Sequence, residues 1–247
     1  MIYLKKFETT AAYNAARENL ILPNVSLITE NNKVAYNPLN PTPPTPSHDY
    51  VEIGGVKWAT MNIGANSITD YGLYFEWGNP QGYSADQIGC EEGKKCFDRY
   101  YADYKWTEDG GSTFTKYNDE DGLTTLQSAD DAVAAAWGGN WRMPTTAEFQ
   151  ALGAAVNTAL TQVDGVYGLQ CTDKTDSSKV LFFPACGDVY DGVNHLVGYD
   201  GGIYWSSSLD SDSVESAYAL NFYASGINWN LGYSRCHGFS VRGVLGN

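Results

Sequence analysis

The sequence predicts an α+β fold in which a large C-terminal domain follows a small N-terminal αβ head. Two short segments with helix-capping residues lie in the middle of the chain, and segments of alternating apolar and polar residues lie on both sides of them. A proline-rich stretch at 38–46 indicates a semi-rigid linker. The expected organisation is a head at 1–37, a linker at 38–49 and a domain at 50–247.

The head is expected to contain a short strand at 2–4 and an alanine-rich helix at 9–20, which Pro23 ends. Residues 25–28 and 33–36 flank a polar tip and predict a hairpin. So few apolar residues hardly make an independent core. We therefore expect the head to dock on a neighbour or to form a homo-oligomer, such as a trimer.

The C-terminal domain should begin with a hairpin, because 51–53 and 56–58 flank a Gly-Gly pair. The aromatic segment 71–78 predicts a further strand. Residues 82–121 are polar and show no clear period, which predicts an elaborate loop.

Two helices follow. Ser-Ala-Asp-Asp at 128–131 and Thr-Thr-Ala-Glu at 145–148 both have the form of a capping box. They predict helices at 129–137 and from 145 to about 156, with a glycine pair ending the first.

Strands are predicted at 166–171, 179–184, 217–223 and 238–245, and a long irregular loop at 224–237. Within the third strand the period of two places Tyr218, Leu220 and Phe222 on the core face. Ala219, Asn221 and Tyr223 are then expected to point outward.

Composition limits the classes of function. The formal net charge of -14 argues against nucleic acid and anionic membrane surfaces as partners. No apolar segment has the length of a signal peptide or a membrane span, which suggests synthesis in the cytoplasm without membrane insertion. The five cysteines lack C-x-x-C spacing and there are only three histidines, so no metal site and no cofactor are expected. Cys90 and Cys96 can close a small loop, and the odd total leaves at least one free thiol.

Residues 203–245 combine Tyr and Trp with many Ser, Asn and Gly residues. Antibody paratopes have this composition, because stiff aromatic rings provide contact area and small polar residues provide adaptable hydrogen bonds. The alternative is a Ser/Asn-rich turn region of an ordinary β domain. For the proline-rich stretch at 38–46, the alternative to a linker between two domains is a loop within a single domain.

Five ordered blocks carry a family resemblance: Lys-Trp-Ala-Thr-Met-Asn-Ile-Gly-Ala at 57–65, Tyr-Gly-Leu-Tyr-Phe-Glu-Trp-Gly at 71–78, Trp-Gly-Gly-Asn-Trp-Arg-Met-Pro-Thr at 137–145, Tyr-Trp-Ser-Ser-Ser at 204–208 and Gly-Phe-Ser-Val-Arg at 238–242. Together they resemble the Fibrobacter succinogenes major paralogous domain family. The resemblance implies the formylglycine-generating-enzyme type of C-type lectin fold, with two helices, short mixed strands and long loops.

The C-terminal blocks also resemble the variable proteins of diversity-generating retroelements, which implies a hypervariable ligand-binding surface. By match to that pattern, the candidate ligand-binding residues are Asp210, Asp212, Ala219, Asn221, Tyr223, Asn228, Asn230, Gly232, Tyr233, Ser234, Cys236 and His237. The head and linker resemble head segments of structural proteins of gut-bacterial prophages. The expected location is therefore the virion, on a phage tail.

The leading hypothesis is a receptor-binding protein, not an enzyme, that recognises a cell-surface protein or glycan. A bacterial cell-surface adhesin is the alternative within the binding class. An oxidase of the formylglycine-generating type is less favoured, because Cys171, Cys186 and Cys236 match no cysteine-pair motif. Arg142 is expected to anchor the turn between the helices and Glu148 to cap the second helix, rather than to act in catalysis with Asp130 and Asp131.

Calcium-dependent sugar binding is the remaining option. Asp188 and Asp191 have ligand oxygens that suit calcium. However, Leu231 stands where a lectin signature would place a ligand carboxylate.

Overall fold

The structure, a computed structural model, describes residues 48–108, 111, 113–195 and 201–246, together with short strands at 5–6, 27–28 and 33–34. The chain divides into two compact units, Met1–Ser47 and His48–Asn247.

In the N-terminal unit, the described strands β1 (Lys5–Lys6), β2 (Leu27–Ile28) and β3 (Lys33–Val34) form an antiparallel sheet in the order β1-β3-β2. The predicted hairpin is confirmed, because Leu27 pairs with Val34 and Ile28 with Lys33. The predicted strand at 2–4, the helix at 9–20 and the linker at 38–46 lie outside the described residues.

The predicted α+β class is wrong, because the structure is mostly β, with 42% strand and 10% helix. Every pairing between described strands is antiparallel. Both predicted helices of the C-terminal unit are present but short. Segments without a predicted strand, at 156–163, 202–209 and 226–234, supply much of the additional strand content.

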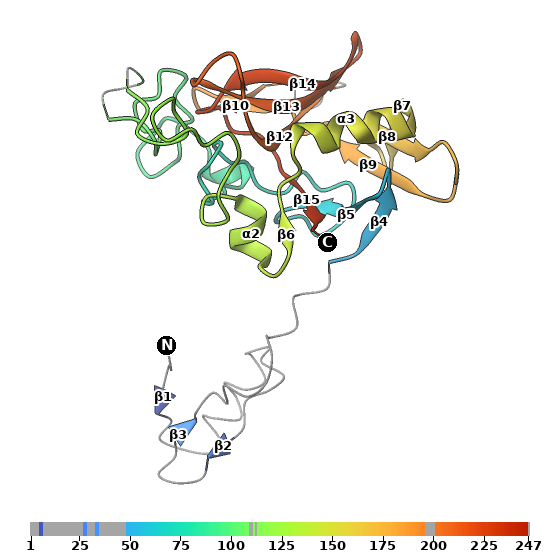
Figure 1. Cartoon of the computed structure of the whole chain (residues 1–247), viewed down its shortest axis with the longest axis horizontal. Coiled ribbons are helices and arrows are strands. Elements are labelled where there is room, and N and C mark those ends of the chain that lie inside the picture. Colours follow the sequence, from blue (N-terminus) through green and yellow to red (C-terminus); the bar gives the residue numbers. More distant parts are fainter. Residues whose placement is uncertain are drawn as a thin grey trace. The chain divides into compact units, whose positions relative to one another are not determined.

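A four-stranded sheet joins the two ends of the C-terminal unit in the order β4-β5-β15-β6. Its members are β4 (Tyr50–Ile53), β5 (Val56–Asn62), β15 (Arg242–Leu245) and β6 (Trp141–Arg142). The predicted hairpin at the start of the domain is therefore confirmed. The predicted closing strand is shorter than expected, because residues 238–240 make only isolated bridges to other segments. Figure 1 shows this sheet beside the carboxyl end of the chain.

The predicted strand at 71–78 is also wrong. Within it, only Tyr74 and Phe75 form bridges, to Tyr83 and Phe239 respectively. Residues 82–121 contain only a 3-10 turn, η1 (Ala85–Gln87), among their described elements.

The two helices begin at different kinds of cap. Helix α3 (Thr146–Ala155) has the predicted capping box between Thr145 and Glu148. Helix α2 (Ala132–Trp137) begins three residues later than predicted. The carboxylate of Asp131 caps it by accepting hydrogen bonds from the N–H groups of Val133 and Ala134.

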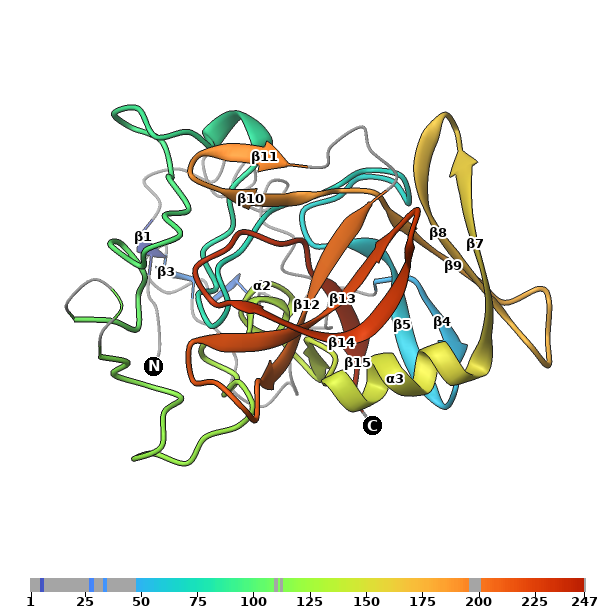
Figure 2. The same ribbon diagram turned by 90° about the horizontal axis from the view of Figure 1, so that it is seen from above.

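A second sheet has the order β7-β8-β9, formed by β7 (Val156–Val163), β8 (Val166–Asp173) and β9 (Val180–Pro184). Only β8 and β9 were predicted. Asp164 and Gly165 both have positive φ and form the two-residue turn that joins β7 to β8. This hairpin lies at one end of the C-terminal unit (Figure 2).

The third sheet has the order β12-β13-β14, formed by β12 (Gly202–Leu209), β13 (Ser216–Tyr223) and β14 (Gly226–Ser234). The predicted loop at 224–237 is wrong, since most of it is β14. Helix α3 packs against this sheet. A short hairpin of β10 (Asp188–Tyr190) and β11 (Val193–His195) follows β9 along the chain.

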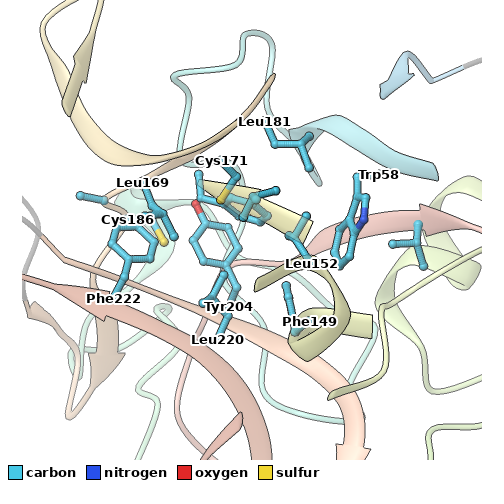
Figure 3. Close-up of a cluster of buried hydrophobic side chains, with 14 of the residues drawn as sticks. Trp58, Phe149, Leu152, Leu169, Cys171, Leu181, Cys186, Tyr204, Leu220 and Phe222 are labelled. Carbon is cyan, nitrogen blue, oxygen red and sulfur yellow. The ribbon is translucent and has the colours of Figure 1, made fainter. Parts of the chain in front are cut away.

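Neighbouring residues of β12 contribute to two different cores. Tyr204 lies in a cluster with Leu220, Phe222 and residues of β8, β9 and α3 (Figure 3). Trp205 points the other way, into a cluster with Ala219 and Phe239. Side chains cover both faces of β12 and β13. These two strands therefore form a fixed support for β14, which pairs with β13.

Candidate functional site

The structure separates the twelve predicted ligand-binding residues by exposure. Asp212, Tyr223, Asn228 and Asn230 are exposed. A second group is half-buried: Asp210, Gly232, Tyr233, Ser234 and His237. The remaining three are buried: Ala219, Asn221 and Cys236.

The outward orientation predicted for Ala219 and Asn221 is therefore wrong. Both side chains are on the predicted face of β13, but the segment around Phe239 covers that face. Ala219 packs in the same cluster as Trp205 and Phe239. Asn221 is 2% exposed and donates a hydrogen bond of 2.6 Å from Nδ2 to the Tyr233 hydroxyl.

Cys236 is a structural residue in this arrangement. It lies in a small cluster with Tyr101, Tyr104 and Phe114, and burial raises its pKa to about 12. Its thiol is therefore kept protonated and away from solvent.

Five predicted residues of the β13–β14 hairpin and the segment that follows it have exposed or half-buried side chains, and we call them the hairpin surface: Tyr223, Asn228, Asn230, Tyr233 and His237. Asn228 is directly opposite Asn221 in the strand register. Burial raises the pKa of Tyr233 to about 12, and the nearby Tyr223 hydroxyl adds to that shift. Tyr233 and His237 both meet the Phe239 ring edge-on, at centroid distances of 5.1 and 5.8 Å.

The hairpin surface continues into a stack of rings that the sequence did not predict. The Tyr190 ring lies between His195, at 4.0 Å, and His237, at 5.0 Å. The Arg99 guanidinium is 5.5 Å from the Tyr190 centroid and pairs with Asp191. The hairpin of β10 and β11 thus places aromatic and cationic groups beside the predicted residues.

Two titratable groups in this region are shifted in opposite directions. Burial lowers the pKa of His237 to about 4, and its Nδ1 atom has no hydrogen-bond partner. Burial raises the pKa of Asp188 to about 6, although His195 opposes the shift. At neutral pH the His237 imidazole is therefore neutral, and the buried Asp188 carboxyl is mostly ionised.

Two other predicted residues, Asp210 and Asp212, line a groove of about 480 Å³ at the opposite end of the β13–β14 pair. Asp119 and Glu215 also line it, which makes the groove acidic. Gly232 lets the Asp210 carboxylate approach β14 closely, because a Cβ atom at position 232 would lie 2.1 Å from the Asp210 Oδ2 atom.

Arg235, the residue after β14, holds the loop segment 104–117 in place. It is fully buried, and its guanidinium donates to the Tyr104 hydroxyl and to the backbone carbonyls of Lys116, Tyr117 and Val214. The same guanidinium lies 4.7 Å from the Phe114 ring centroid. No local sequence pattern predicts this role, because Tyr104, Lys116 and Tyr117 are more than a hundred residues away from Arg235 in the chain.

The residues weighed for catalysis have structural partners. Arg142 donates two hydrogen bonds, of 2.8 and 2.6 Å, to the Glu148 carboxylate, which also accepts from the Thr145 N–H. Asp130 accepts from Lys105, Lys116 and the Tyr117 hydroxyl.

The cysteines fall into two groups. Cys90 and Cys96 form a disulfide, whereas Cys171, Cys186 and Cys236 are free and buried. Burial raises the pKa of Cys171 to about 12 and also raises that of Cys186.

Among the residues that the structure describes, no group of three or more His, Cys, Asp or Glu side chains is arranged to hold a metal ion. Asp191, considered as a calcium ligand, is paired with Arg99. In the same described part of the chain, no helix has the length and apolar character needed to cross a membrane.

Comparison with known proteins adds no relative: no family model, no curated protein and no solved structure matches the chain.

Proposed function

We propose that this protein is a binding protein that recognises a cell-surface protein or glycan through the hairpin surface. The observation that carries the proposal is the position of Tyr223, Asn228 and Tyr233 on one hairpin, beside the stacked rings of Tyr190 and His237. An exposed tyrosine beside asparagine amides offers a flat apolar face together with hydrogen-bonding groups. Proteins and sugars both present complementary groups to such a surface.

The rigidity of the support favours this use. The β12–β13 pair is covered on both faces, and Asn221 holds the Tyr233 hydroxyl from below. Little side-chain freedom remains to be lost when Tyr233 contacts a partner, which lowers the entropic cost of binding. Tyr223 is 41% exposed, so a partner can reach its side chain from solvent.

The resemblance to the Fibrobacter succinogenes major paralogous domain family and to retroelement variable proteins supports the same proposal. On that basis we place the chain on a phage tail as a receptor-binding protein, displayed in several copies by its N-terminal head. Multivalent display multiplies weak single-site affinity by about 10²–10⁴. Display by a bacterial cell surface would use the same contacts.

The test removes the exposed contact groups and leaves the buried ones in place. In the full chain, Tyr223→Ala, Asn228→Ala and Asn230→Ala are combined, and adsorption of the fluorescently labelled protein to a panel of intact bacterial cells is measured. All three side chains are exposed, so the fold should be retained, and an unchanged far-UV circular dichroism spectrum checks this. The expected result is at least a tenfold loss of adsorption to every strain that the unmodified chain binds.

A matched control makes the same chemical changes elsewhere. Tyr50→Ala, Asn66→Ala and Asn140→Ala also remove one tyrosine ring and two amides from exposed positions. This control should adsorb like the unmodified chain. Equal adsorption of the two triple variants would refute the hairpin surface as the contact site.

A further inference from the structure

The outer edge of the β7-β8-β9 sheet is an open strand. Among the described residues, β7 pairs only with β8, so its other side has no strand partner. Residues 157–160 and 162 are exposed. Figures 1 and 2 both show the β7–β8 hairpin at the margin of the C-terminal unit.

The turn determines which backbone groups face outward. Asp164 and Gly165 have φ values of 48° and 81° and join Val163 to Val166, which is the geometry of a two-residue type I′ hairpin. In that geometry Val163 and Val166 form a hydrogen-bonded pair, and alternate residues back along β7 also bond to β8. The N–H and C=O groups of Thr158, Leu160 and Gln162 therefore point to the open edge.

This edge lacks the features that normally prevent strand addition. Charged residues, proline, bulges and short length protect most edge strands. β7 spans eight residues, is uncharged from end to end and pairs with β8 without a bulge. Leu160, one of the residues whose backbone groups point to the open edge, has a side chain that is 41% exposed. Tyr167 of β8 lies on the same face of the sheet as Leu160 and is 45% exposed.

We propose that β7 is an interface at which a second copy of this chain adds its own β7 in antiparallel fashion. The register is self-complementary: with Leu160 on the two-fold axis, Leu160 faces Leu160 of the partner subunit, and Thr158 faces Gln162 of the partner subunit. All six outward backbone groups then find partners. The two three-stranded sheets become one six-stranded sheet.

The distribution of charge along the chain favours a second copy of this chain as the partner that pairs with β7. A chain with a net charge of -14 repels its own copies over most of its surface. The segment 156–172 carries one charged residue, Asp164. In the proposed register the two copies of Asp164 lie roughly 26 Å apart along the strands, beyond the screening length of about 10 Å.

The interface is small. A single strand pair buries less than the roughly 1,200 Å² of a standard interface, so the association is weak and depends on concentration. It is independent of the proposed ligand-binding function and of any oligomer formed by the N-terminal head, because it uses neither surface.

Cross-linking provides the test. In a hydrogen-bonded antiparallel pair the two Cα atoms of residue 160 lie about 5.5 Å apart, within the range for a disulfide. The full chain carrying Leu160→Cys is incubated with oxidised glutathione at chain concentrations from about 1 µM to about 1 mM, the range over which weak interfaces fill. The three native free cysteines are buried, and the other two already form a disulfide. The expected result is a disulfide-linked dimer.

Val193→Cys is the matched control, because Val193 is 52% exposed but lies on β11. It should stay uncross-linked under the same conditions. No dimer from Leu160→Cys at the highest concentration, or equal dimer from both variants, would overturn the proposal. Sedimentation equilibrium gives a second readout: Leu160→Lys should weaken association at least tenfold and Val193→Lys should not, and equal masses for the two variants at every concentration would also overturn it.

Discussion

The guanidinium of Arg242 lies 4.8 Å from the centroid of the Phe183 ring and is fully buried. It donates to the Asn62 side chain and to the backbone carbonyls of Ala59, Thr60 and Phe182. Arg242 therefore ties the last strand to β5 and to β9, and it connects two of the three main sheets of the C-terminal unit.

We predict that Arg242→Lys lowers the free energy of unfolding by about 2–5 kcal/mol. Lysine keeps the charge but cannot reach four separate acceptors, so buried carbonyls are left unpaired. Urea unfolding with an unchanged m-value measures the effect. The control is Arg142→Lys, whose arginine side chain is 40% exposed and which should cost about 1 kcal/mol or less. Equal losses for the two variants would contradict the role assigned to Arg242.

Asp131, rather than Ser128, is predicted to determine the start of α2. The Asp131 carboxylate accepts from the N–H groups of Val133, Ala134 and Met143, whereas Ser128 is exposed. Asp131→Ala should therefore destabilise the protein by about 1–3 kcal/mol, because three backbone N–H groups, two of them in buried hydrogen bonds, lose their acceptor. Ser128→Ala should change stability by less than about 0.5 kcal/mol. Thermal unfolding of both variants provides the comparison, and a larger loss from Ser128→Ala would restore the predicted capping box.

Gly153→Ala should destabilise the protein although alanine is the better helix former. A Cβ atom at Gly153 would lie 2.5 Å from the Trp229 ring, so α3 and β14 would have to separate. We expect a loss of about 1–3 kcal/mol, which outweighs a propensity gain of about 1 kcal/mol. In a Trp229→Leu background the same substitution should become neutral or stabilising. A double-mutant cycle in urea measures the coupling, and an additive result would exclude the contact as its cause.

The titrations of Asp188 and His237 should make the free energy of unfolding depend on pH in opposite directions. The folded-state pKa of Asp188 is raised from 3.8 to about 6, so its stabilising contribution is complete below pH 3.8 and is lost as the pH rises through 6. The folded-state pKa of His237 is lowered from 6.5 to about 4, so its contribution is complete above pH 6.5 and is lost as the pH falls through 4. Each effect is on the order of 3 kcal/mol, and they nearly cancel.

Single variants should reveal the two effects separately. Relative to the unmodified chain, Asp188→Asn gains stability as the pH rises from 4 to 7, and His237→Gln gains stability as the pH falls over the same range. The double variant should follow the unmodified chain. The measurement is the urea midpoint at each pH, and parallel curves for the two single variants would show that the shifts arise elsewhere.

The sequence was informative where local chemistry decides the structure. The capping box of α3 and the hairpin of β4 and β5 depend on residues within a few positions of one another, and both were predicted. β14 was missed although Ile227, Trp229, Leu231 and Tyr233 alternate regularly, because the residues between them, two asparagines and a glycine, are typical of turns. β12 was missed for the opposite reason, since residues 202–207 are all buried and show no alternation.

The candidate site was only partly predictable, because it depends on contacts between distant parts of the chain. A period of two places Ala219 and Asn221 on one face of β13 but does not reveal what covers that face. Tyr190 and His195 were missed because their neighbour His237 is more than forty residues further along the chain. Only the packing of the β10–β11 hairpin beside the end of β14 brings these rings together.

The hydrogen bond from Asn221 to Tyr233 has a consequence for any attempt to re-engineer recognition. Two positions that a library would normally randomise separately are in direct contact, one beneath the other, so the outcome of a change at either depends on the residue at its neighbour. Diversity introduced at 223, 228 and 230 should be tolerated one position at a time, whereas codons 221 and 233 have to be sampled as a pair. Selection from such a library should enrich combinations at those two positions rather than single residues.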